Sequence, residues 1–183
     1  MEGHSQRGIM GLASIQDYET QKIKRHEFTL AKKEEDRTKL TDVQNANMGP
    51  VFLTFRDNQE AIRERIDKCC EIPCYGDVTS DDGVQHVLWR CTPDDADFFE
   101  AQFAAIDALY VCDGHHRTQS AYNVGKLRRE KYMAEGREYT GEEPFNYFMT
   151  LFYPADNLKI LDYNRVLKTL EDHTTESFME ALS

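Results

Sequence analysis

The sequence predicts a single domain of the α/β (α+β) class, spanning residues 1–183, in which helices flank a mixed sheet. Short apolar runs rich in β-branched and aromatic residues alternate with longer stretches that have helical spacing. An Asp-Gly pair between two strand-like runs indicates an antiparallel hairpin in the middle of the chain. The chain is also long enough to bury one substantial core, and 40% hydrophobic with 30% charged residues is typical of globular proteins.

The first half of the chain is expected to contain two strands and two helices. Residues 9–18 (IMGLASIQDY) predict a strand of mixed burial, and residues 29–47 predict a charged helix that runs into a polar loop. Residues 51–55 (VFLTF) have the composition of a buried strand. Residues 58–70 carry apolar side chains at helical spacing, and Asn58 is a suitable N-cap for that helix.

The hairpin follows, with its turn at Asp82-Gly83 between the strand-like runs of residues 73–92. Residues 93–106 open with proline and two acids, as helix N-termini do, and continue with apolar side chains at helical spacing. Residues 108–112 (ALYVC) predict a further strand.

Four elements are expected in the last third of the chain. Residues 116–136 predict a long helix that Gly136 ends. Residues 144–154 predict a strongly apolar strand, and residues 158–163 (LKILDY) predict one more strand. Residues 174–183 predict the start of a capped helix. Because this helix is still running at the last residue, and a strand follows closely on the polar first residues, both ends are expected to be truncated.

The overall charge and the cysteines restrict the class of partner. The net charge of −11 argues against direct nucleic-acid binding, which relies on basic surface. No apolar run approaches the roughly 20 residues of a membrane helix, and the first residues lack the order of a signal peptide. The five cysteines form no even framework, so we expect reduced thiols and a cytoplasmic location. These cysteines are Cys69, Cys70, Cys74, Cys91 and Cys112.

Residues 111–122 (VCDGHHRTQSAY) place a dense group of ionisable side chains at the end of a predicted strand. Gly114 permits an unusual backbone angle, and a helix is expected to begin near His115 or His116. The first N–H groups of a helix have no intrahelical partners and the helix dipole is positive there, so the position favours anions. Arg117 adds a guanidinium that can grip a phosphate or a carboxylate through two parallel hydrogen bonds.

Asp113 is out of place in an anion site unless it binds a cation or acts as a base. An Mg²⁺ ion held by this one carboxylate and by substrate phosphates would explain its presence. Alternatively, Asp113 is a helix cap and the two histidines are solvated. A zinc site is disfavoured, because adjacent histidines project about 100° apart on a helix and the sequence Cys69-Cys70-x-x-x-Cys74 lacks a second ligand pair.

Two other groups of polar residues are candidates for a site. Residues 23–29 (IKRHEFT) contain Lys24, Arg25, His26 and Glu27, which taken alone are typical of a solvated turn. Arg56 follows the strand at 51–55, and strand ends are where open α/β sheets place their ligands. The alternative for Arg56 is an ordinary exposed arginine.

Four long segments of this chain occur in the order and spacing of one family. The chain is therefore identified as a member of domain of unknown function 1015, whose members are sometimes labelled SpoOJ regulators or ParB-like proteins. Members are longer at both ends and usually have tyrosine where this chain has Thr118, and histidine where it has Asn164. The four segments are IKRHEFTLAKKEEDR (23–37), NANMGPVFLTFRD (45–57), CDGHHRTQSAY (112–122) and PFNYFMTLFYPADNLKILDYNRV (144–166).

The Asp-Gly-His-x-Arg motif also resembles the phosphate-binding loop of the ParB/sulfiredoxin superfamily, at a strand-to-helix junction. Members of that superfamily bind nucleotides and include kinases that act on free serine. By analogy, the resemblance implies a phosphotransferase that uses ATP or ADP with Mg²⁺ on a small hydroxylated metabolite. Two alternatives stay open: a nucleotide-binding ParB-like sensor without catalysis, and a degenerate fragment that keeps only the fold. The sequence does not indicate an oligomeric state.

The resemblance also implies a role for each residue of the motif. Gly114, His115, His116 and Arg117 would bind the phosphates, and Asp113 would orient Mg²⁺ or the attacking hydroxyl. The two histidines are included among the catalytic candidates. From the earlier segments, Glu27 would be the general base, and a group of cations would neutralise developing charge. Those cations are Lys24, Arg25 and Arg56.

Overall fold

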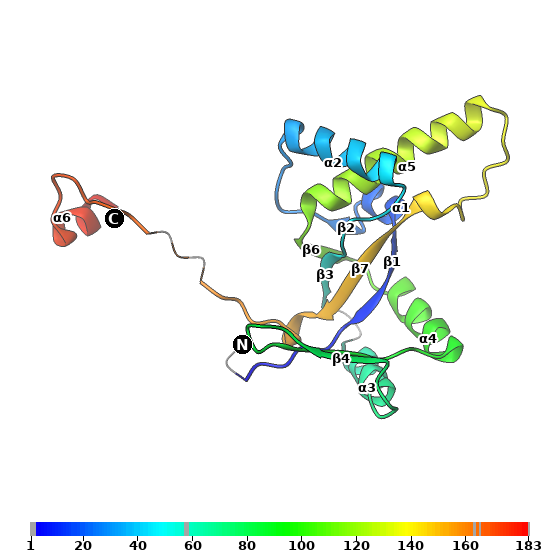
Figure 1. Cartoon of the computed structure of the whole chain (residues 1–183), viewed down its shortest axis with the longest axis horizontal. Coiled ribbons are helices and arrows are strands. Elements are labelled where there is room, and N and C mark those ends of the chain that lie inside the picture. The colour runs from blue at the N-terminus through cyan, green and yellow to red at the C-terminus, as the bar shows by residue number, and fades with distance from the viewer. Residues whose placement is uncertain (1–2, 57–58, 163, 165, 183) are drawn as a thin grey trace.

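A computed structural model describes residues 3–56, 59–162, 164 and 166–182. Its centre is a five-stranded mixed sheet flanked by helices (Figure 1), which confirms the predicted fold class. The strands are short and rich in β-branched and aromatic residues, as buried strands usually are. They are β1 (Ile9–Ser14), β2 (Ile23–Lys24), β3 (Val51–Phe55), β6 (Leu109–Asp113) and β7 (Tyr147–Pro154).

Strands that are distant in the sequence are neighbours in this sheet, whose order is β1-β7-β3-β6-β2. β7 pairs antiparallel with β1 and parallel with β3, while β6 pairs antiparallel with β3 and parallel with β2. In the register, Tyr110 lies opposite Lys24 on one side and opposite Thr54 on the other. The chain therefore leaves β2 and β6 at the same edge of the sheet, and leaves β3 at the opposite edge.

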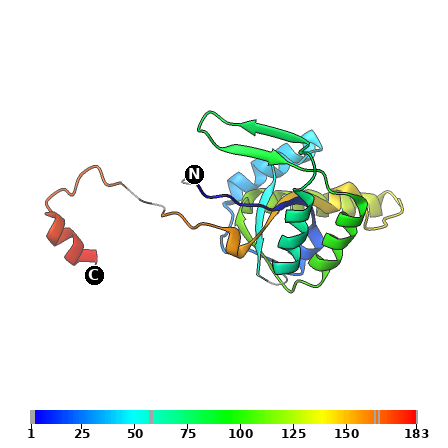
Figure 2. The same ribbon diagram turned by 90° about the horizontal axis from the view of Figure 1, so that it is seen from below.

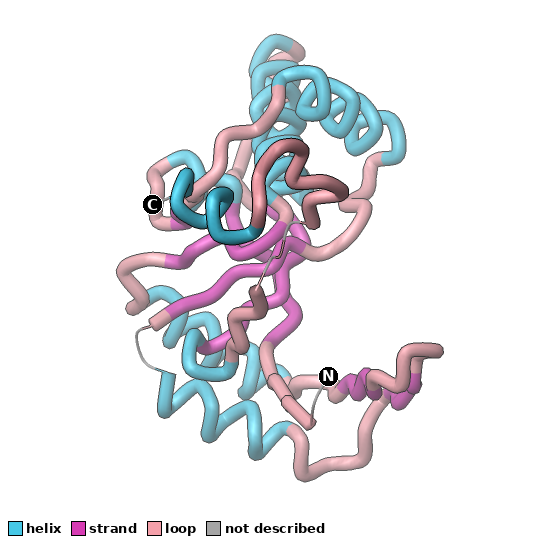
Figure 3. Tube along the Cα trace, turned by 90° about the vertical axis from the view of Figure 1, so that its left-hand side faces the viewer, coloured by secondary structure: helices cyan, strands magenta, loops and turns pink. Residues whose placement is uncertain are grey.

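The helices form two groups, one at each end of the strands (Figure 3). At one end, α2 packs along α5, and α1 also contacts α5. At the other end, α3 contacts α4. No helix in the described part of the chain has both the length and the apolar character that a membrane crossing requires. The helices are α1 (Ile15–Glu19), α2 (Ala31–Gln44), α3 (Gln59–Cys69), α4 (Pro93–Ala104) and α5 (His115–Ala134).

The core lies on one face of the sheet. In β3 and β7 every second residue is buried, and the residues between them are partly exposed. Side chains from α3, α4 and α5 join these strands in one apolar cluster, represented by Ile62, Phe99 and Ala121. Since each large buried apolar side chain contributes about 1.5–3 kcal/mol, this cluster holds the end of β6 and the start of α5 in place.

The predicted hairpin is confirmed, although it forms a separate two-stranded sheet that projects from the body (Figure 2). Its strands are β4 (Gly76–Thr79) and β5 (Gln85–Leu88), which pair antiparallel. The predicted helix at 93–106 is also confirmed as α4. Thr92 and Asp95 form a capping box at its N-terminus, so the helix start is defined by side-chain hydrogen bonds.

Two predictions for the first half of the chain need correction. The strand predicted over 9–18 ends at Ser14, because the Ser14 hydroxyl accepts a hydrogen bond from the Gln16 N–H and caps α1. The short strand β2 lies in a segment where a solvated turn was one prediction. Its two residues pair with β6, a contact that the local pattern does not indicate. Asn58, the predicted cap of α3, lies outside the described residues.

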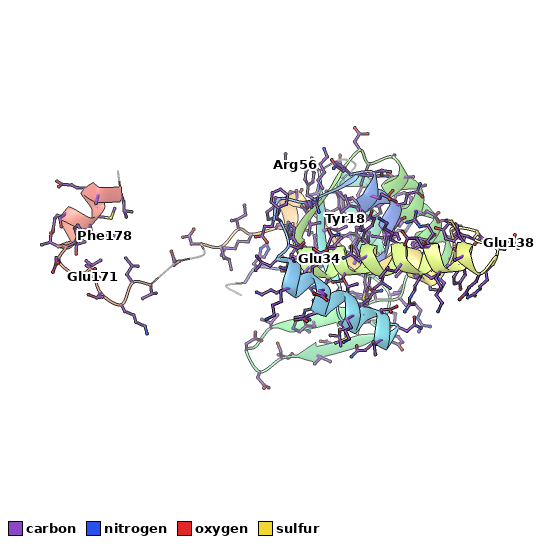
Figure 4. The ribbon with its side chains drawn as sticks, turned by 90° about the horizontal axis from the view of Figure 1, so that it is seen from above. Tyr18, Glu34, Arg56, Glu138, Glu171 and Phe178 are labelled. Atoms are coloured by element: carbon purple, nitrogen blue, oxygen red, sulfur yellow. The ribbon has the colours of Figure 1, made fainter. Side chains whose placement is uncertain are left out.

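The strand predicted over 158–163 is wrong for the part that the structure describes, since residues 158–162 have no regular secondary structure. Ile160 is 95% exposed, so its apolar side chain has no partner surface that would make it a strand residue. Tyr163 lies outside the described residues. The chain then leaves the body, and the expected final helix is α6 (Thr175–Leu182). Figure 4 shows Glu171 and Phe178 on this segment, away from the sheet.

Candidate functional site

The junction between β6 and α5 has the backbone geometry that the sequence predicts. Gly114 occupies the N-cap of α5 with φ of +97°, a left-handed conformation that favours glycine. A Cβ atom at this position would lie 3.1 Å from the Nε and Nη2 atoms of Arg117. Gly114 supplies no side chain to cap the helix, so the N–H groups of the first turn have no side-chain acceptor from the cap residue.

A cleft of about 610 Å³ lies at this junction, and we call it the glycine cleft. The sheet topology explains why the cleft combines distant segments. β2 and β6 are parallel neighbours, so the residues that follow Lys24 lie beside the residues that follow Tyr110. The cleft is lined by Glu27, Lys33, Asp36, Arg37, Met48, Asp113, Gly114, His115, His116 and Arg117.

Helix α2 supplies three cleft residues that the sequence did not single out: Lys33, Asp36 and Arg37. Positions three and four apart lie on one face of a helix, so this spacing was the available signal. No residue of α2 is fully buried, so apolar packing alone does not position the helix. Polar contacts with α5 contribute, among them the hydrogen bond from Asn123 to Glu34 at 2.8 Å.

The Glu34 contact belongs to a short network at the start of α2. The Thr29 hydroxyl donates to the other oxygen of the same carboxylate at 2.6 Å. These two hydrogen bonds, that from Thr29 first, lower the pKa of Glu34 below its ordinary value. The ionised carboxylate therefore links the start of α2 to α5 at neutral pH.

The charges of the glycine cleft are only partly paired. Arg117 forms an ion pair with Asp113, one helical turn earlier in the chain, which gives the acid of the motif a direct role. Lys33 and Arg37 have no carboxylate of the described residues within 4.0 Å. Glu27 and Asp36 likewise have no Lys or Arg of the described residues within 4.0 Å, so the cleft offers unpaired cations beside the positive end of a helix, which suit phosphates, and unpaired carboxylates, which suit a cation bound with them.

His115 is buried, with only 7% of its side chain exposed, and its Nδ1 atom lies 3.7 Å from Oε2 of Glu27. Its Nε2 atom is buried and has no hydrogen-bond partner among the described residues. Burial, followed by the neighbouring His26 ring at 4.5 Å, lowers the pKa of His115 below its ordinary value. His115 is therefore neutral at neutral pH, with Glu27 as an ionic neighbour that is 62% exposed.

His116 has a different environment. The Leu30 N–H donates a hydrogen bond to its Nε2 atom at 3.4 Å, which ties the start of α2 to the start of α5. The Ser120 hydroxyl donates to the His116 carbonyl at 2.7 Å. The side chain lines the cleft, but its Nε2 atom is already used as an acceptor.

The remaining predicted residues lie elsewhere. Lys24 and Arg56 both lie over the ring of Tyr110, at 5.8 and 5.6 Å from its centroid. Neither lines the glycine cleft. Arg56 follows β3, which runs antiparallel to β6, so it lies toward the opposite edge of the sheet from the Asp113 junction. The structure therefore does not bring these two cations together with Arg117.

Arg25 lines a second cleft of about 560 Å³, which we call the tyrosine cleft. Glu27 lines both clefts, so the segment from β2 to α2 forms the wall between them. The tyrosine cleft is lined by Tyr18, Glu19, Gln21, Ile23, Lys24, Arg25, His26, Glu27, Phe28, Gln119 and Tyr122. The sequence singled out the residues of this cleft at 24–27, but it did not indicate a separate cleft, because the other lining residues come from α1 and from the second turn of α5.

The two departures from the family pattern do not lie in either cleft. Thr118 is fully buried, and its hydroxyl donates to the Gly114 carbonyl at 3.1 Å, so it supports the junction from inside. Asn164 is exposed and follows β7 in the chain. No cluster of three or more potential metal ligands occurs within the described ranges.

The fold and the cleft define a mixed α/β protein with a polar site at a strand-to-helix junction. The family model described as protein of unknown function (DUF1015) matches residues 1–183, and the chain belongs to this family. No curated protein and no solved structure matches the chain.

Proposed function

We propose that the protein is a nucleotide-dependent phosphotransferase that acts on a small hydroxylated metabolite such as free serine. The observation that carries this proposal is the composition of the glycine cleft. A helix start without a side-chain cap, two cations without acidic partners and the Glu27–His115 pair line the same cleft. Phosphoryl transfer depends mainly on positioning and on neutralising charge, and these groups supply both.

The phosphates of ATP or ADP bind at the start of α5 in this proposal. The N–H groups of His115, His116 and Arg117 provide donors along the positive end of the helix dipole. Lys33 and Arg37 approach from α2 and compensate the phosphate charge. Arg117 exchanges its Asp113 partner for a phosphate oxygen, because a doubly charged phosphate offers more acceptors than a single exposed carboxylate.

A nucleotide-bound Mg²⁺ ion fits the acids of the cleft. Asp113 and Asp36 both line it, and Mg²⁺ is commonly held by one or two carboxylates together with phosphate oxygens. Asp113 becomes available for this role when Arg117 turns to the phosphate. Such an ion neutralises negative charge on the phosphates during transfer.

Glu27 is the base in the proposed reaction. Its carboxylate takes the proton from the acceptor hydroxyl while the hydroxyl oxygen forms a bond to phosphorus and the bond to the nucleotide leaving oxygen breaks. His115 supports this role, since a neutral imidazole beside Glu27 adds no positive charge that would weaken the base.

Nucleotide binding is tested by thermal unfolding with ATP or ADP and Mg²⁺. We expect nucleotide to raise the Tm of the parent protein and to have little effect on Arg117→Ala. Arg7→Ala is the matched control, because Arg7 also forms an ion pair with an aspartate but lies outside both clefts. An equal rise in parent and Arg117→Ala would exclude Arg117 from the site.

Transfer is tested by phosphorus NMR with nucleotide, Mg²⁺ and free serine. A new phosphomonoester signal is expected for the parent, and Glu27→Gln is expected to slow its formation about 10²–10⁴-fold while nucleotide binding persists. The absence of any new signal from the parent would reject serine as the acceptor.

The second candidate function is a nucleotide-binding, ParB-like sensor without catalysis. The Asp113–Arg117 ion pair favours it, because a carboxylate that is paired with an arginine is a poorer ligand for the Mg²⁺ ion that catalysis would need. Binding of nucleotide with no hydrolysis and no transfer would support the sensor over the enzyme.

A further inference from the structure

The tyrosine cleft contains an arginine whose charge has no acidic partner. Seven other described arginines form ion pairs with carboxylates. Arg25 has no carboxylate of the described chain within 4.0 Å, although the protein carries a net charge of −11. An arginine without an acid in so acidic a protein is a candidate for binding an external anion.

The guanidinium of Arg25 is also held in position. Its Nη1 atom donates to the Tyr18 hydroxyl at 3.2 Å and to Oε1 of Gln119 at 3.1 Å. The rings of Tyr18 and Phe28 both lie 5.9 Å from its central carbon. These contacts fix the plane of the guanidinium and use one of its nitrogen atoms, so Nε and Nη2 remain to grip an anion side by side.

The two acids of the tyrosine cleft differ in their partners. Glu19 lies 3.6 Å from Arg129 and accepts a hydrogen bond from the Tyr122 hydroxyl at 3.3 Å. Glu27 lies 3.7 Å from the neutral His115 ring, at the wall shared with the glycine cleft, and has no Lys or Arg of the described residues within 4.0 Å. Two cations without acidic partners, Arg25 and Lys24, therefore stand against one unpaired acid, so the net unmatched charge of this cleft is positive, with Lys24 lying over the Tyr110 ring.

The chemistry of the cleft favours a carboxylate over a phosphate. A single guanidinium matches one planar monoanion, whereas the helix start, Lys33 and Arg37 are in the glycine cleft. The rings of Tyr18 and Tyr122, with centroids 5.8 Å apart, and the ring of Phe28 provide apolar walls for a compact ligand. Glu27 lines both clefts, so a ligand bound at Arg25 can present a second group to Glu27.

We propose that the tyrosine cleft binds the acceptor substrate through its carboxylate, with Arg25 as the anchor. The acceptor class is a small hydroxy acid or hydroxy amino acid, whose hydroxyl group points toward Glu27 at the wall between the clefts. This inference rests on the proposed phosphotransferase function. It extends that function by assigning the acceptor to a different cleft from the nucleotide and by requiring a carboxylate.

Calorimetric titration without nucleotide tests the carboxylate requirement separately from catalysis. The probes are L-serine and D-glycerate, with ethanolamine and glycerol as matched compounds that lack the carboxylate. We expect the first two to bind the parent, and the last two to show no binding. Equal binding of ethanolamine and L-serine, or no binding of either carboxylate at tens of millimolar, would overturn the inference, whether or not the protein binds nucleotides.

The arginine is tested by three substitutions. Arg25→Ala is expected to weaken L-serine and D-glycerate binding about tenfold to a hundredfold, and Arg25→Lys to restore only part of it, because lysine lacks the planar fork. Arg90→Ala is the control, since Arg90 also lacks an acidic partner in the described chain but lies over Tyr75, outside both clefts. Unchanged binding in Arg25→Ala would overturn the proposal.

A further titration separates the acceptor from the nucleotide. Adenosine, which has no phosphates, is expected to bind parent and Arg25→Ala equally or not at all. Adenosine binding that Arg25→Ala abolishes would assign the tyrosine cleft to the nucleobase and overturn the inference. Failure of the nucleotide experiments alone, with carboxylate binding intact, would instead reject the phosphotransferase and leave the carboxylate site in place.

Discussion

The two clefts share a wall and a helix but differ in how their residues are assembled. The first turn of α5 lines the glycine cleft, and Gln119, one turn later, lines the tyrosine cleft. The glycine cleft is built around one continuous motif, with a left-handed glycine followed by polar residues. The tyrosine cleft depends on aromatic rings and an arginine that the sheet brings together. A local motif can therefore reveal a helix-start site, while a cleft of scattered side chains requires the fold.

The largest expected difference between the two clefts is in ligand binding after glycine substitution. Gly114→Ala and Gly83→Ala both place a side chain at positive φ, so each should lower the free energy of unfolding by about 1–2 kcal/mol. Only at Gly114 does the new Cβ meet Arg117, at 3.1 Å, whereas nothing lies within 4 Å of the corresponding atom at Gly83. We expect Gly114→Ala alone to lose nucleotide stabilisation, measured as the ligand-dependent rise in Tm.

The same pair of variants also tests whether the clefts bind independently. Binding of L-serine to the tyrosine cleft should be unchanged in both, because neither glycine lines that cleft. A nucleotide-dependent rise in Tm that is as large in Gly114→Ala as in the parent would contradict the assigned phosphate position.

A smaller effect is expected from the pH dependence of the free energy of unfolding, through His115 beside Glu27. The pKa of His115 is lowered in the folded protein, mainly by burial, while the unfolded chain keeps the ordinary value of about 6.5. Below that value the unfolded state binds a proton that the folded state does not, so stability falls as the pH decreases. Urea unfolding at pH 7.5 and 5.5 should show a larger loss for the parent than for His115→Gln.

Replacement of a histidine outside the site provides the control for this pH dependence. His86 is an exposed residue of the hairpin strand β5, and His86→Gln should retain the pH dependence of the parent. A parent-like pH dependence in His115→Gln would show that other groups cause it.

The smallest effect is expected at Arg56. The sequence placed this residue among the phosphate-binding cations, but it lies over the Tyr110 ring and lines neither cleft. Arg56→Ala should leave both the nucleotide-dependent rise in Tm and the affinity for L-serine within about twofold of the parent, or about 0.4 kcal/mol. A clear loss of nucleotide stabilisation in this variant would show that Arg56 contributes to nucleotide binding and that the binding site extends beyond the glycine cleft.

Much of the fold was predictable because its elements have strong local signals. The phenylalanines of α4 at helical spacing, the Asp82-Gly83 turn and the apolar run of β7 each indicate one structure. The predictions failed where local pattern and tertiary contact disagree. Residues 158–162 have the composition of a strand but no neighbouring strand, whereas β2 has only two residues and exists because it pairs with β6.

The candidate site divides in the same way. The β6–α5 junction, with Gly114 at its cap and Arg117 in its first turn, was readable from the sequence because glycine and a helix start are local features. The contribution of α2 was not, since that helix buries no residue fully and polar contacts with α5 contribute to its position. The tyrosine cleft was not readable either, because nothing in the sequence shows that Tyr18, Arg25 and Gln119 share a surface.

The sequence by itself determined the fold class, most elements and the helix start at Gly114, because these depend on short-range backbone preference and apolar periodicity. Four long sequence segments identified the family. Only the tertiary structure decided which charges meet at that helix start. The parallel pairing of β2 with β6 brings Glu27 to His115, and the antiparallel pairing of β3 with β6 carries Arg56 away. Strand direction depends on contacts between distant segments, and no local pattern in this chain encodes it.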